Sequence, residues 1–254
     1  MREFGLIGRT LRHSFSQTYF TQKFDSLHLS NHQYELFELG TMEELPALLS
    51  AHPNLCGLNV TIPYKEKVWP FLTRVAPSAA RVGAVNTIEF TRDGQLIGHN
   101  TDMVGFRESV RSLLPTDFAG RALVLGSGGG SKAVEVALRD LGIGYWVVSR
   151  NPLGQGLTYD ELTPEVMRDH PLIINTTPLG TFPDEHECPP IPYQALTNEH
   201  FLYDLIYNPR ETEFMKRGLA VGAQAKNGFE MLCIQAEEAW KIWNGEGEGD
   251  KVTR

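Results

Sequence analysis

The segment "ALVLGSGGGSKAVEVALRDLG" (residues 122–142) gives the clearest indication of fold class in the sequence. It has the pattern of a buried strand, a glycine-rich turn and an amphipathic helix, in that order. The turn nearly fits the dinucleotide-binding pattern G-x-G-x-x-G/A with Gly126, Ser127, Gly128, Gly129, Gly130 and Ser131. The first glycine permits a tight turn, the second lets a pyrophosphate approach the backbone, and the helix offers amide hydrogens to that anion. Strand, turn and helix together favour a dinucleotide site.

Two other interpretations of this turn stay open. The phosphate loop of nucleotide hydrolases ends in G-K-[ST], and here the corresponding residues are Ser131, Lys132 and Ala133, so that two of the three disagree. A glycine-rich turn that binds no ligand is the other alternative.

The end of the next predicted strand indicates which dinucleotide would bind. An acidic residue there binds the ribose hydroxyls of NAD, whereas an arginine suits the extra phosphate of NADP. Ser149 and Arg150 stand at this position, and Arg150 therefore favours NADP through its charge and by stacking on the adenine. A solvated arginine at a strand end is the alternative. Only about 21 residues separate Arg150 from Leu172, so we expect a shortened dinucleotide domain.

The remaining pattern predicts an α/β protein of two domains with a cleft between them. Strand-like and helix-like patches alternate in residues 1–102, which we expect to form an α/β substrate domain with a hairpin at Asp93-Gly94. Residues 103–227 are predicted to form a Rossmann-like dinucleotide-binding domain. A last helix, 228–244, should pack back onto the first domain, and 245–254 reads as a disordered tail.

Composition limits the partners. The chain has 254 residues, a formal net charge of -8 and a pI near 5.5, which argues against nucleic acid. No stretch approaches the roughly 20 apolar residues of a membrane span, and the start lacks a signal peptide pattern. Three widely spaced cysteines favour a reducing, cytoplasmic setting. We expect no metal, because the His186-Glu187-Cys188 cluster lies in a proline-rich loop without further ligands.

The segment "NVTIPYKEK" (59–67) places a lysine after a short strand and a proline. Pro63 suits the first position of a helix, which would put Lys65 in its first turn. The helix dipole there disfavours a cation and would lower the pKa of Lys65, as a proton-exchanging group needs. A solvated surface lysine is the alternative.

Several spaced motifs together resemble the shikimate dehydrogenase family, NADP-dependent oxidoreductases of aromatic amino-acid biosynthesis. The motifs are "NVTIPYK" (59–65), "GAVNT" (83–87), "HNTDMVGF" (99–106), "GSGGGSK" (126–132) and Gln235 after "NGFEML". The resemblance runs from Phe4 to about Trp243. It implies reversible reduction of 3-dehydroshikimate to shikimate with NADPH, on the pathway to chorismate.

The resemblance also implies roles for individual residues. Lys65 and Asp102 match the family's catalytic pair, although an aspartate before a helix is also a natural N-cap. Positions that match the substrate contacts are Ser14, Ser16, Asn59, Thr61, Lys65, Asn86, Asp102, Tyr207 and Gln235. Thr176, the backbone of Leu205 and Gly228 would lie along the cofactor. Ser14 and Gln17 equally fit a capping box.

Other specificities and states stay open. Asn227 and Glu230 depart from common family residues near the nicotinamide end, and Glu230 would either narrow the site or face solvent. Quinate or aminoshikimate as substrate, NAD or dual cofactor use, and a non-catalytic sensor of the same ligands are alternatives. A folate-pathway dehydrogenase shares the architecture but not the Ser14/Ser16 pattern. The chain is expected to be a monomer or a homodimer.

Overall fold

The computed structural model describes residues 1–11, 14–152 and 156–246, which form two compact units. One unit holds Met1–Thr101 together with the chain from Ala236, and the other holds Asp102–Gln235. The last helix, α8 (Phe229–Trp243), therefore contributes its first half to the second unit and its second half to the first. The predicted assignment of all of 228–244 to the first domain differs from this division.

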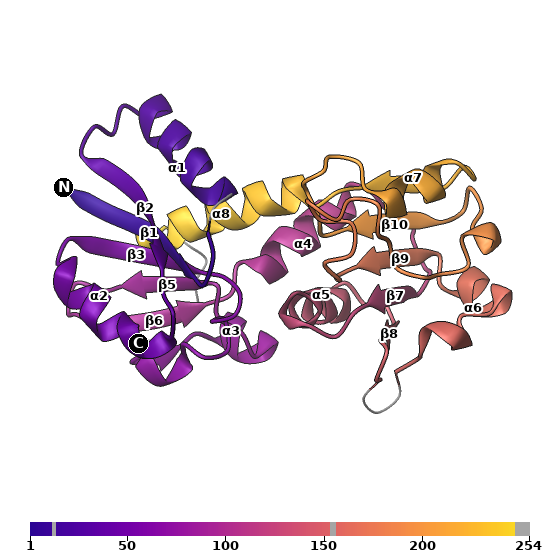
Figure 1. Cartoon of the computed structure of the whole chain (residues 1–254), viewed down its shortest axis with the longest axis horizontal. Coiled ribbons are helices and arrows are strands. Elements are labelled where there is room, and N and C mark those ends of the chain that lie inside the picture. Colours follow the sequence, from indigo (N-terminus) through magenta and orange to yellow (C-terminus); the bar gives the residue numbers. More distant parts are fainter. Residues whose placement is uncertain (12–13, 153–155, 247–254) are drawn as a thin grey trace. The chain divides into compact units, whose positions relative to one another are not determined.

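The first unit is built on a mixed sheet with the order β2-β1-β3-β5-β6-β4 (Figure 1). Its strands are β1 (Arg2–Gly8), β2 (His32–Glu38), β3 (Leu55–Val60), β4 (Arg74–Val75), β5 (Thr87–Phe90) and β6 (Leu96–His99). Strand β1 pairs in parallel with β2 and β3, as strands joined by helices do. Strands β5 and β6 form the predicted antiparallel hairpin, and Gly94 in its turn has a φ of 79°.

Side chains alternate between the two faces of this sheet, so β1 serves two cores. Phe4 faces α1 (Phe15–Ser26) and the second half of α8, where it packs with Phe20 and Trp243. Ile7 faces the opposite core, to which α2 (Leu45–Ala51) and α3 (Pro77–Val82) contribute. Two short 3₁₀ helices, Met42–Glu44 and Trp69–Phe71, complete the unit.

The helix predicted after Pro63 does not form, which corrects the argument made for Lys65. Residues 62–68 follow a series of turns. The carbonyl of Lys65 accepts a hydrogen bond of 2.7 Å from the amide of Val85, a residue distant in sequence. This long-range bond uses the acceptor that an α-helix would offer to residue 69. No helix dipole therefore acts on the Lys65 ammonium through its own segment.

The second unit is built on a parallel sheet with the order β11-β10-β9-β7-β8. Its strands are β7 (Ala122–Leu125), β8 (Tyr145–Val148), β9 (Leu172–Asn175), β10 (Phe201–Asp204) and β11 (Gln224–Lys226). All its strand pairs are parallel, which agrees with the doubly wound domain that the sequence predicts. The short strand β11 was not predicted.

Helices cover both faces of this sheet, as a parallel sheet requires. They are α4 (Asp102–Arg111), α5 (Gly129–Asp140), α6 (Pro164–Asp169) and α7 (Glu213–Leu219), with the start of α8. Met167 of α6 and Phe214 of α7 pack with Leu123 and Leu202 on one face. On the other face, Phe106 of α4 meets the Tyr203 ring edge-on at 5.0 Å between ring centroids.

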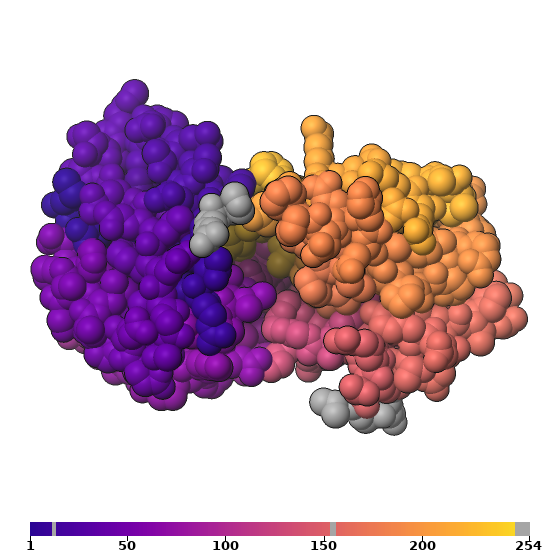
Figure 2. All heavy atoms as spheres, in the orientation of Figure 1, coloured from indigo at the N-terminus to yellow at the C-terminus, as the bar shows by residue number. Residues whose placement is uncertain are grey.

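The connection from β8 to β9 is short, as predicted. Among the described residues it contains only a 3₁₀ turn, Tyr159–Glu161, and the six-residue α6. On the visible face of the second unit, the salmon-coloured residues of this connection lie below the orange residues that follow β9 (Figure 2). Within the described part of the chain, no helix has both the length and the apolar character needed to cross a membrane.

Candidate active site

The predicted cofactor residues gather at one edge of the second unit's sheet. The carboxyl ends of parallel strands share an edge, and here Gly126 follows β7, Ser149 follows β8, Thr176 follows β9 and Leu205 follows β10. Strand β8 lies on one side of β7, and the next strand in the chain, β9, lies on its other side, so the strand order reverses at β7. Ligands of open α/β sheets bind at such a point.

Gly126 and Gly128 of the turn are glycines for different structural reasons. Gly126 has a φ of 105°, and a Cβ at this position would lie 2.9 Å from the hydroxyl of Thr176. Gly128 instead faces open space, since no heavy atom lies within 4 Å of its hypothetical Cβ. Helix α5 begins immediately after Gly128 and directs its amides there. The Ser131 hydroxyl donates to the Gly128 carbonyl at 2.8 Å and closes the turn.

Leu205 and Gly228 lie against each other. The amide of Gly228 donates to the carbonyl of Ile206 at 3.0 Å, and any Cβ at Gly228 would overlap the carbonyl of Leu205. The Leu205 side chain also reaches to 3.3 Å from the hypothetical Cβ of Gly130. The structure thus brings two predicted backbone contacts beside the glycine-rich turn.

A cavity of about 620 Å³ opens at this edge of the second unit. It is lined by Gly126, Ser127, Gly128, Ser149, Arg150, Asn151, Tyr159, Thr176, Thr177, Pro178, Leu179 and Pro190. Six of the predicted cofactor residues are in this set; Gly129, Gly130, Ser131, Leu205 and Gly228 are not. This position beside the glycine-rich turn is the one that the sequence predicts for the adenosine half of a dinucleotide.

A buried carboxyl group that the sequence did not indicate supports this edge. Asp204 accepts hydrogen bonds from Asn175 Nδ2 at 3.0 Å, from the Ile206 amide at 3.0 Å and from Thr212 Oγ1 at 2.6 Å. Asn175 in turn accepts from the amide of Thr177 at 3.0 Å. Burial raises the pKa of Asp204 to about 6 despite these donors. The network connects the loop after β9 with the loop after β10.

The first unit holds a buried network of amides and hydroxyls at the carboxyl end of β3. Asn86 Oδ1 accepts from the Thr101 amide at 2.8 Å, and Asn86 Nδ2 donates to Thr101 Oγ1 at 2.9 Å. Asn59 donates to Thr87 Oγ1 at 3.3 Å and accepts from the Tyr34 hydroxyl at 2.7 Å. Because these groups hold each other, both predicted amides have fixed orientations.

Tyr34 is a member of this network that sequence reasoning missed. It is 4% exposed, stacks on Phe20 at 4.7 Å between ring centroids, and its hydroxyl also lies within hydrogen-bonding reach of Ser16. Its position in "YELFEL" is that of an ordinary core tyrosine in a strand. A buried tyrosine needs a hydrogen-bond partner for its hydroxyl, and this requirement could have indicated that Tyr34 contacts a polar residue.

Ser14 stands at the N-cap of α1 but forms no capping hydrogen bond. Gln17 donates to the Tyr34 carbonyl at 3.4 Å, so the alternative capping box does not form. The Ser14 Oγ is buried and has no hydrogen-bond partner among the described residues. A buried hydroxyl without a partner loses free energy unless a ligand supplies one. This favours the predicted contact of Ser14 with a ligand.

The remaining predicted residues divide between the units. Thr61, whose amide donates to the Ile7 carbonyl at 2.9 Å, and the half-buried Lys65 belong to the first unit. Asp102, Tyr207 and Gln235 belong to the second. The pairing of Lys65 with Asp102 therefore stays a prediction.

Asp102 is the first residue of α4, one position inside the helix from the predicted N-cap. A carboxylate in the first helical turn interacts favourably with the helix dipole.

Gln235 and Tyr207 are the other two predicted substrate contacts in the second unit. Gln235 is 8% exposed, and its side chain donates to the Leu232 carbonyl at 2.9 Å. Burial raises the pKa of the Tyr207 hydroxyl.

Both departures from the family pattern have local explanations. The Glu230 carboxylate pairs with Lys226 and accepts from the hydroxyls of Ser109 and Ser112, each at 3.2 Å. Its side chain is therefore used within the second unit. Asn227 donates to the Arg210 carbonyl at 2.8 Å and accepts from the Phe229 amide at 3.1 Å, which caps the start of α8.

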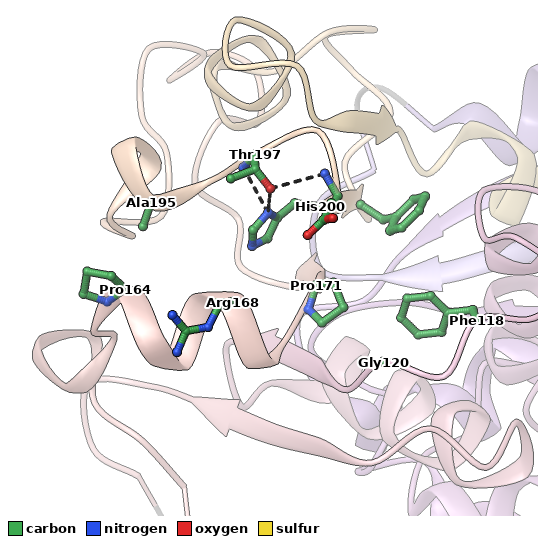
Figure 3. A pocket seen from close by; sticks show the side chains of 10 residues that line it. Phe118, Gly120, Pro164, Arg168, Pro171, Ala195, Thr197 and His200 are labelled. Atoms are coloured by element: carbon green, nitrogen blue, oxygen red, sulfur yellow. Dashed lines mark hydrogen bonds between the residues drawn. The ribbon is translucent and has the colours of Figure 1, made fainter.

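A second cavity, of about 480 Å³, lies among the loops at the amino ends of β9 and β10 (Figure 3). Its central polar group is His200, whose ring accepts from the Thr197 amide at 3.0 Å and donates to the Met167 carbonyl at 3.1 Å. These bonds use both ring nitrogens, so His200 has a structural role. Among the described residues, no group of three His, Cys, Asp or Glu side chains gathers as a metal would require.

Comparisons with known proteins agree with these features. The family model for the shikimate dehydrogenase substrate binding domain matches residues 6–88. Shikimate dehydrogenase (NADP(+)) of Clostridium beijerinckii is 37% identical over 269 residues, with 100% of this chain and 96% of that protein covered.

Solved structures show that the similarity in fold also spans nearly the whole chain. Shikimate 5-dehydrogenase of Thermus thermophilus, in complex with NADP(H) and shikimate, is 33% identical, with a TM-score of 0.84 and coverage of 96% and 94%. Quinate dehydrogenase of Corynebacterium glutamicum, in complex with NAD, is 28% identical, with a TM-score of 0.85 and coverage of 98% and 95%. Identity above 30% over nearly the full length of both chains shows that this chain belongs to the shikimate dehydrogenase family.

Proposed function

We propose that this chain catalyses the reversible, NADPH-dependent reduction of 3-dehydroshikimate to shikimate, on the pathway to chorismate and the aromatic amino acids. The observation that carries the proposal is the buried network around Asn59 and Asn86, together with the buried Ser14 hydroxyl, which has no hydrogen-bond partner among the described residues. Amides and hydroxyls both donate and accept, which suits a polyhydroxylated ring acid. Membership of the family supports the same activity.

The residues at the sheet edge of the second unit fit the cofactor. The open space at Gly128 and the amides of α5 suit a pyrophosphate, and Arg150 suits an additional phosphate. When bound there, NADPH supplies the hydride. Thr176, Leu205 and Gly228 would border the cofactor from its pyrophosphate towards its nicotinamide.

The proposed proton transfer uses Lys65. Its ammonium group donates a proton to the carbonyl oxygen as that oxygen becomes an alkoxide, and accepts the proton back in the oxidative direction. Asp102 orients the ammonium group and shares its proton. General acid catalysis of this kind accelerates reactions about 10²- to 10⁴-fold.

The assignment of substrate contacts follows the chemistry of each group. Ser14 and Ser16 would bind the carboxylate, while Asn59, Thr61 and Asn86 would bind ring hydroxyls. Tyr207 and Gln235 would complete the set from the second unit.

Replacing Lys65 by alanine should lower kcat by about 10²- to 10⁴-fold, the contribution of general acid catalysis, and leave the affinity for NADP nearly unchanged. Equal losses in both would contradict its proton-transfer role.

The decisive experiment follows absorbance of the reduced nicotinamide with purified protein. Shikimate, quinate and an aminated analogue are each combined with NADP and with NAD. We expect the highest kcat/KM for shikimate with NADP. A preference for quinate with NAD would support the alternative that the similarity to quinate dehydrogenase favours. Tight binding of shikimate and NADP without any turnover would support a sensor instead.

The setting and assembly complete the proposal. We place the protein in the cytoplasm, since no disulfide joins Cys56, Cys188 and Cys233, as a reducing compartment would have it. Both a monomer and a homodimer are compatible with the proposed activity. Light scattering of the purified chain distinguishes the two.

A further inference from the structure

The adenosine cavity of the second unit has an unusual charge composition for a phosphate site. Among the described residues that line it, Arg150 is the single charged one, and none is acidic. Because this set contains no carboxylate, it lacks the acidic residue that binds the paired ribose hydroxyls of NAD in dinucleotide-binding domains. A phosphate dianion held by one exposed arginine would need further donors. Five lining residues carry hydroxyl groups, but Thr176 and Thr177 already donate to the Leu125 carbonyl and to Asn175 Oδ1, and Ser127 belongs to the glycine-rich turn. Ser149 and Tyr159 remain as donors on the side of Arg150.

Ser149 presents the first of these donors. The residue is 7% exposed, and its Oγ is buried without a hydrogen-bond partner among the described residues. Its amide is already used, because it donates to the Leu157 carbonyl at 2.9 Å. A buried hydroxyl that lines a cavity and bonds to nothing is expected to bind what occupies that cavity.

Tyr159 comes from the shortened connection after β8. Leu157 returns alongside the end of that strand, where its amide donates to the Val147 carbonyl at 2.9 Å. A capping box between Thr158 and Glu161 then forms the 3₁₀ turn that carries Tyr159. The turn thereby places the tyrosine beside Arg150 at the cavity.

The ring and the hydroxyl of Tyr159 lie in different environments. The ring packs against the apolar core of the second unit. No hydrogen bond joins the hydroxyl to a described residue, and the positive charge of Arg150 acts on it. Burial raises the pKa of Tyr159 more than Arg150 lowers it, so the hydroxyl keeps its proton at neutral pH. It is therefore a donor.

We propose that Ser149, Arg150 and Tyr159 form a single-cation site for the 2′-phosphate of NADP, in which two neutral hydroxyls supply the hydrogen bonds that the one arginine does not. This inference rests on the proposed use of NADP. Each hydroxyl donates one hydrogen bond to a phosphate oxygen, and Arg150 supplies the charge. Tyr159 is then a specificity-determining residue that the dinucleotide motif does not contain. Its effect is confined to the phosphate, since NAD has a hydroxyl there.

The test measures binding rather than turnover. Isothermal titration of the full chain compares adenosine 2′,5′-bisphosphate with adenosine 5′-monophosphate, which lacks the 2′-phosphate. The variants are Tyr159→Phe and Ser149→Ala, each of which removes one hydroxyl and keeps the packing atoms. Tyr145→Phe is the matched control, because its hydroxyl bonds to Glu135 at 3.2 Å and the residue does not line the cavity.

We expect each variant to weaken the bisphosphate by about 10-fold or more, the usual effect of losing a hydrogen bond to a charged group. Affinity for the monophosphate should change less than about 2-fold, and Tyr145→Phe should change neither. Unchanged bisphosphate affinity in Tyr159→Phe, or an equal loss for both ligands, would overturn the role of Tyr159. The same outcomes for Ser149→Ala would overturn that of Ser149.

The proposed function can fail independently of this site. A protein that prefers the bisphosphate, with loss in the two variants, but does not oxidise shikimate would keep the phosphate site and lose the proposed reaction. A protein that oxidises shikimate equally well with NAD and NADP, and binds both adenosine ligands alike, would lose the phosphate site alone. Circular dichroism of each variant confirms that the fold is retained before titration.

Discussion

Single side chains set the polar geometry of the first unit, and Tyr34 is the residue whose effect is easiest to isolate. Its hydroxyl donates to Asn59 Oδ1, which leaves the Asn59 amino group directed at Thr87 and the Asn86 carbonyl. Asn59 is therefore held in one of its two amide orientations. Neither the motif nor the strand pattern contains this partnership.

Tyr34→Phe should raise KM for shikimate several-fold with a smaller change in kcat, since Asn59 loses its fixed orientation. Stability should fall by about 1–3 kcal/mol, because the buried Asn59 oxygen loses its donor. Steady-state kinetics and urea denaturation measure both effects. Tyr64→Phe is the control: it removes a buried hydroxyl that donates to the Leu39 carbonyl, so stability should fall while KM stays the same. Equal KM changes in both variants would argue against a positioning role.

Asp204 predicts a pH dependence of stability. Burial raises its pKa from 3.8 to about 6, so the folded state binds this proton more tightly than the unfolded state does. The stability that this proton contributes is fully present below about pH 4 and is lost as the pH rises through about 6.

Urea denaturation of the unmodified chain and of Asp204→Asn tests this dependence between pH 4.5 and 7.5. The Asn variant should be less stable throughout, because its amino group faces hydrogen-bond donors. The difference in free energy of unfolding between the two proteins should shrink by roughly 1–3 kcal/mol as the pH rises. A difference that is constant with pH would show that Asp204 titrates normally.

At the scale of elements, the turn between β7 and α5 uses its glycines for different reasons. Gly126 needs a positive φ and closeness to Thr176, whereas Gly128 has an ordinary φ of -83° and open space. The fold therefore requires the first glycine, whereas the second is explained by the proposed ligand.

Alanine variants of the two glycines distinguish the role in the fold from the role in ligand binding. Gly126→Ala should cost about 1–3 kcal/mol of stability, because alanine is strained at that φ. Gly128→Ala should cost less than about 1 kcal/mol but weaken NADP by about 10-fold or more, because its methyl group occupies the space of the pyrophosphate. Thermal denaturation and titration with NADP measure the two effects. Similar NADP affinities for Gly128→Ala and the unmodified chain would remove the pyrophosphate from this turn.

At the scale of the whole molecule, the two units differ in how the chain builds them. The second is one continuous segment, Asp102–Gln235. The first needs the end of α8, because Phe4 packs on Trp240 and Trp243 at 5.7 and 4.9 Å between ring centroids. The Trp243 indole also donates to the Ile88 carbonyl at 3.0 Å.

Fragments should reflect this difference. We expect 102–235 to unfold cooperatively by circular dichroism, whereas 1–101 should lack a cooperative transition, since its aromatic core would be open to water. Joining 236–246 to 1–101 through a flexible linker should restore the transition. A stable 1–101 fragment would show that α8 is dispensable for the first unit.

Local patterns by themselves determined most strands, the hairpin at Asp93-Gly94, the glycine-rich turn and the helix Phe229–Trp243, because hydrophobic periodicity and backbone preference depend on near neighbours. The resemblance, from motifs alone, indicated the family and the cofactor class. Tertiary structure decided the rest. The bond from Val85 to the Lys65 carbonyl replaced a predicted helix.

The return of Leu157 to β8 brought Tyr159 to the cavity, and Tyr34 met Asn59 across the sheet. Each of these contacts joins a polar group to a partner that only the folded chain brings near. A sequence shows that a buried group needs a partner, but the choice of partner depends on which strands become neighbours.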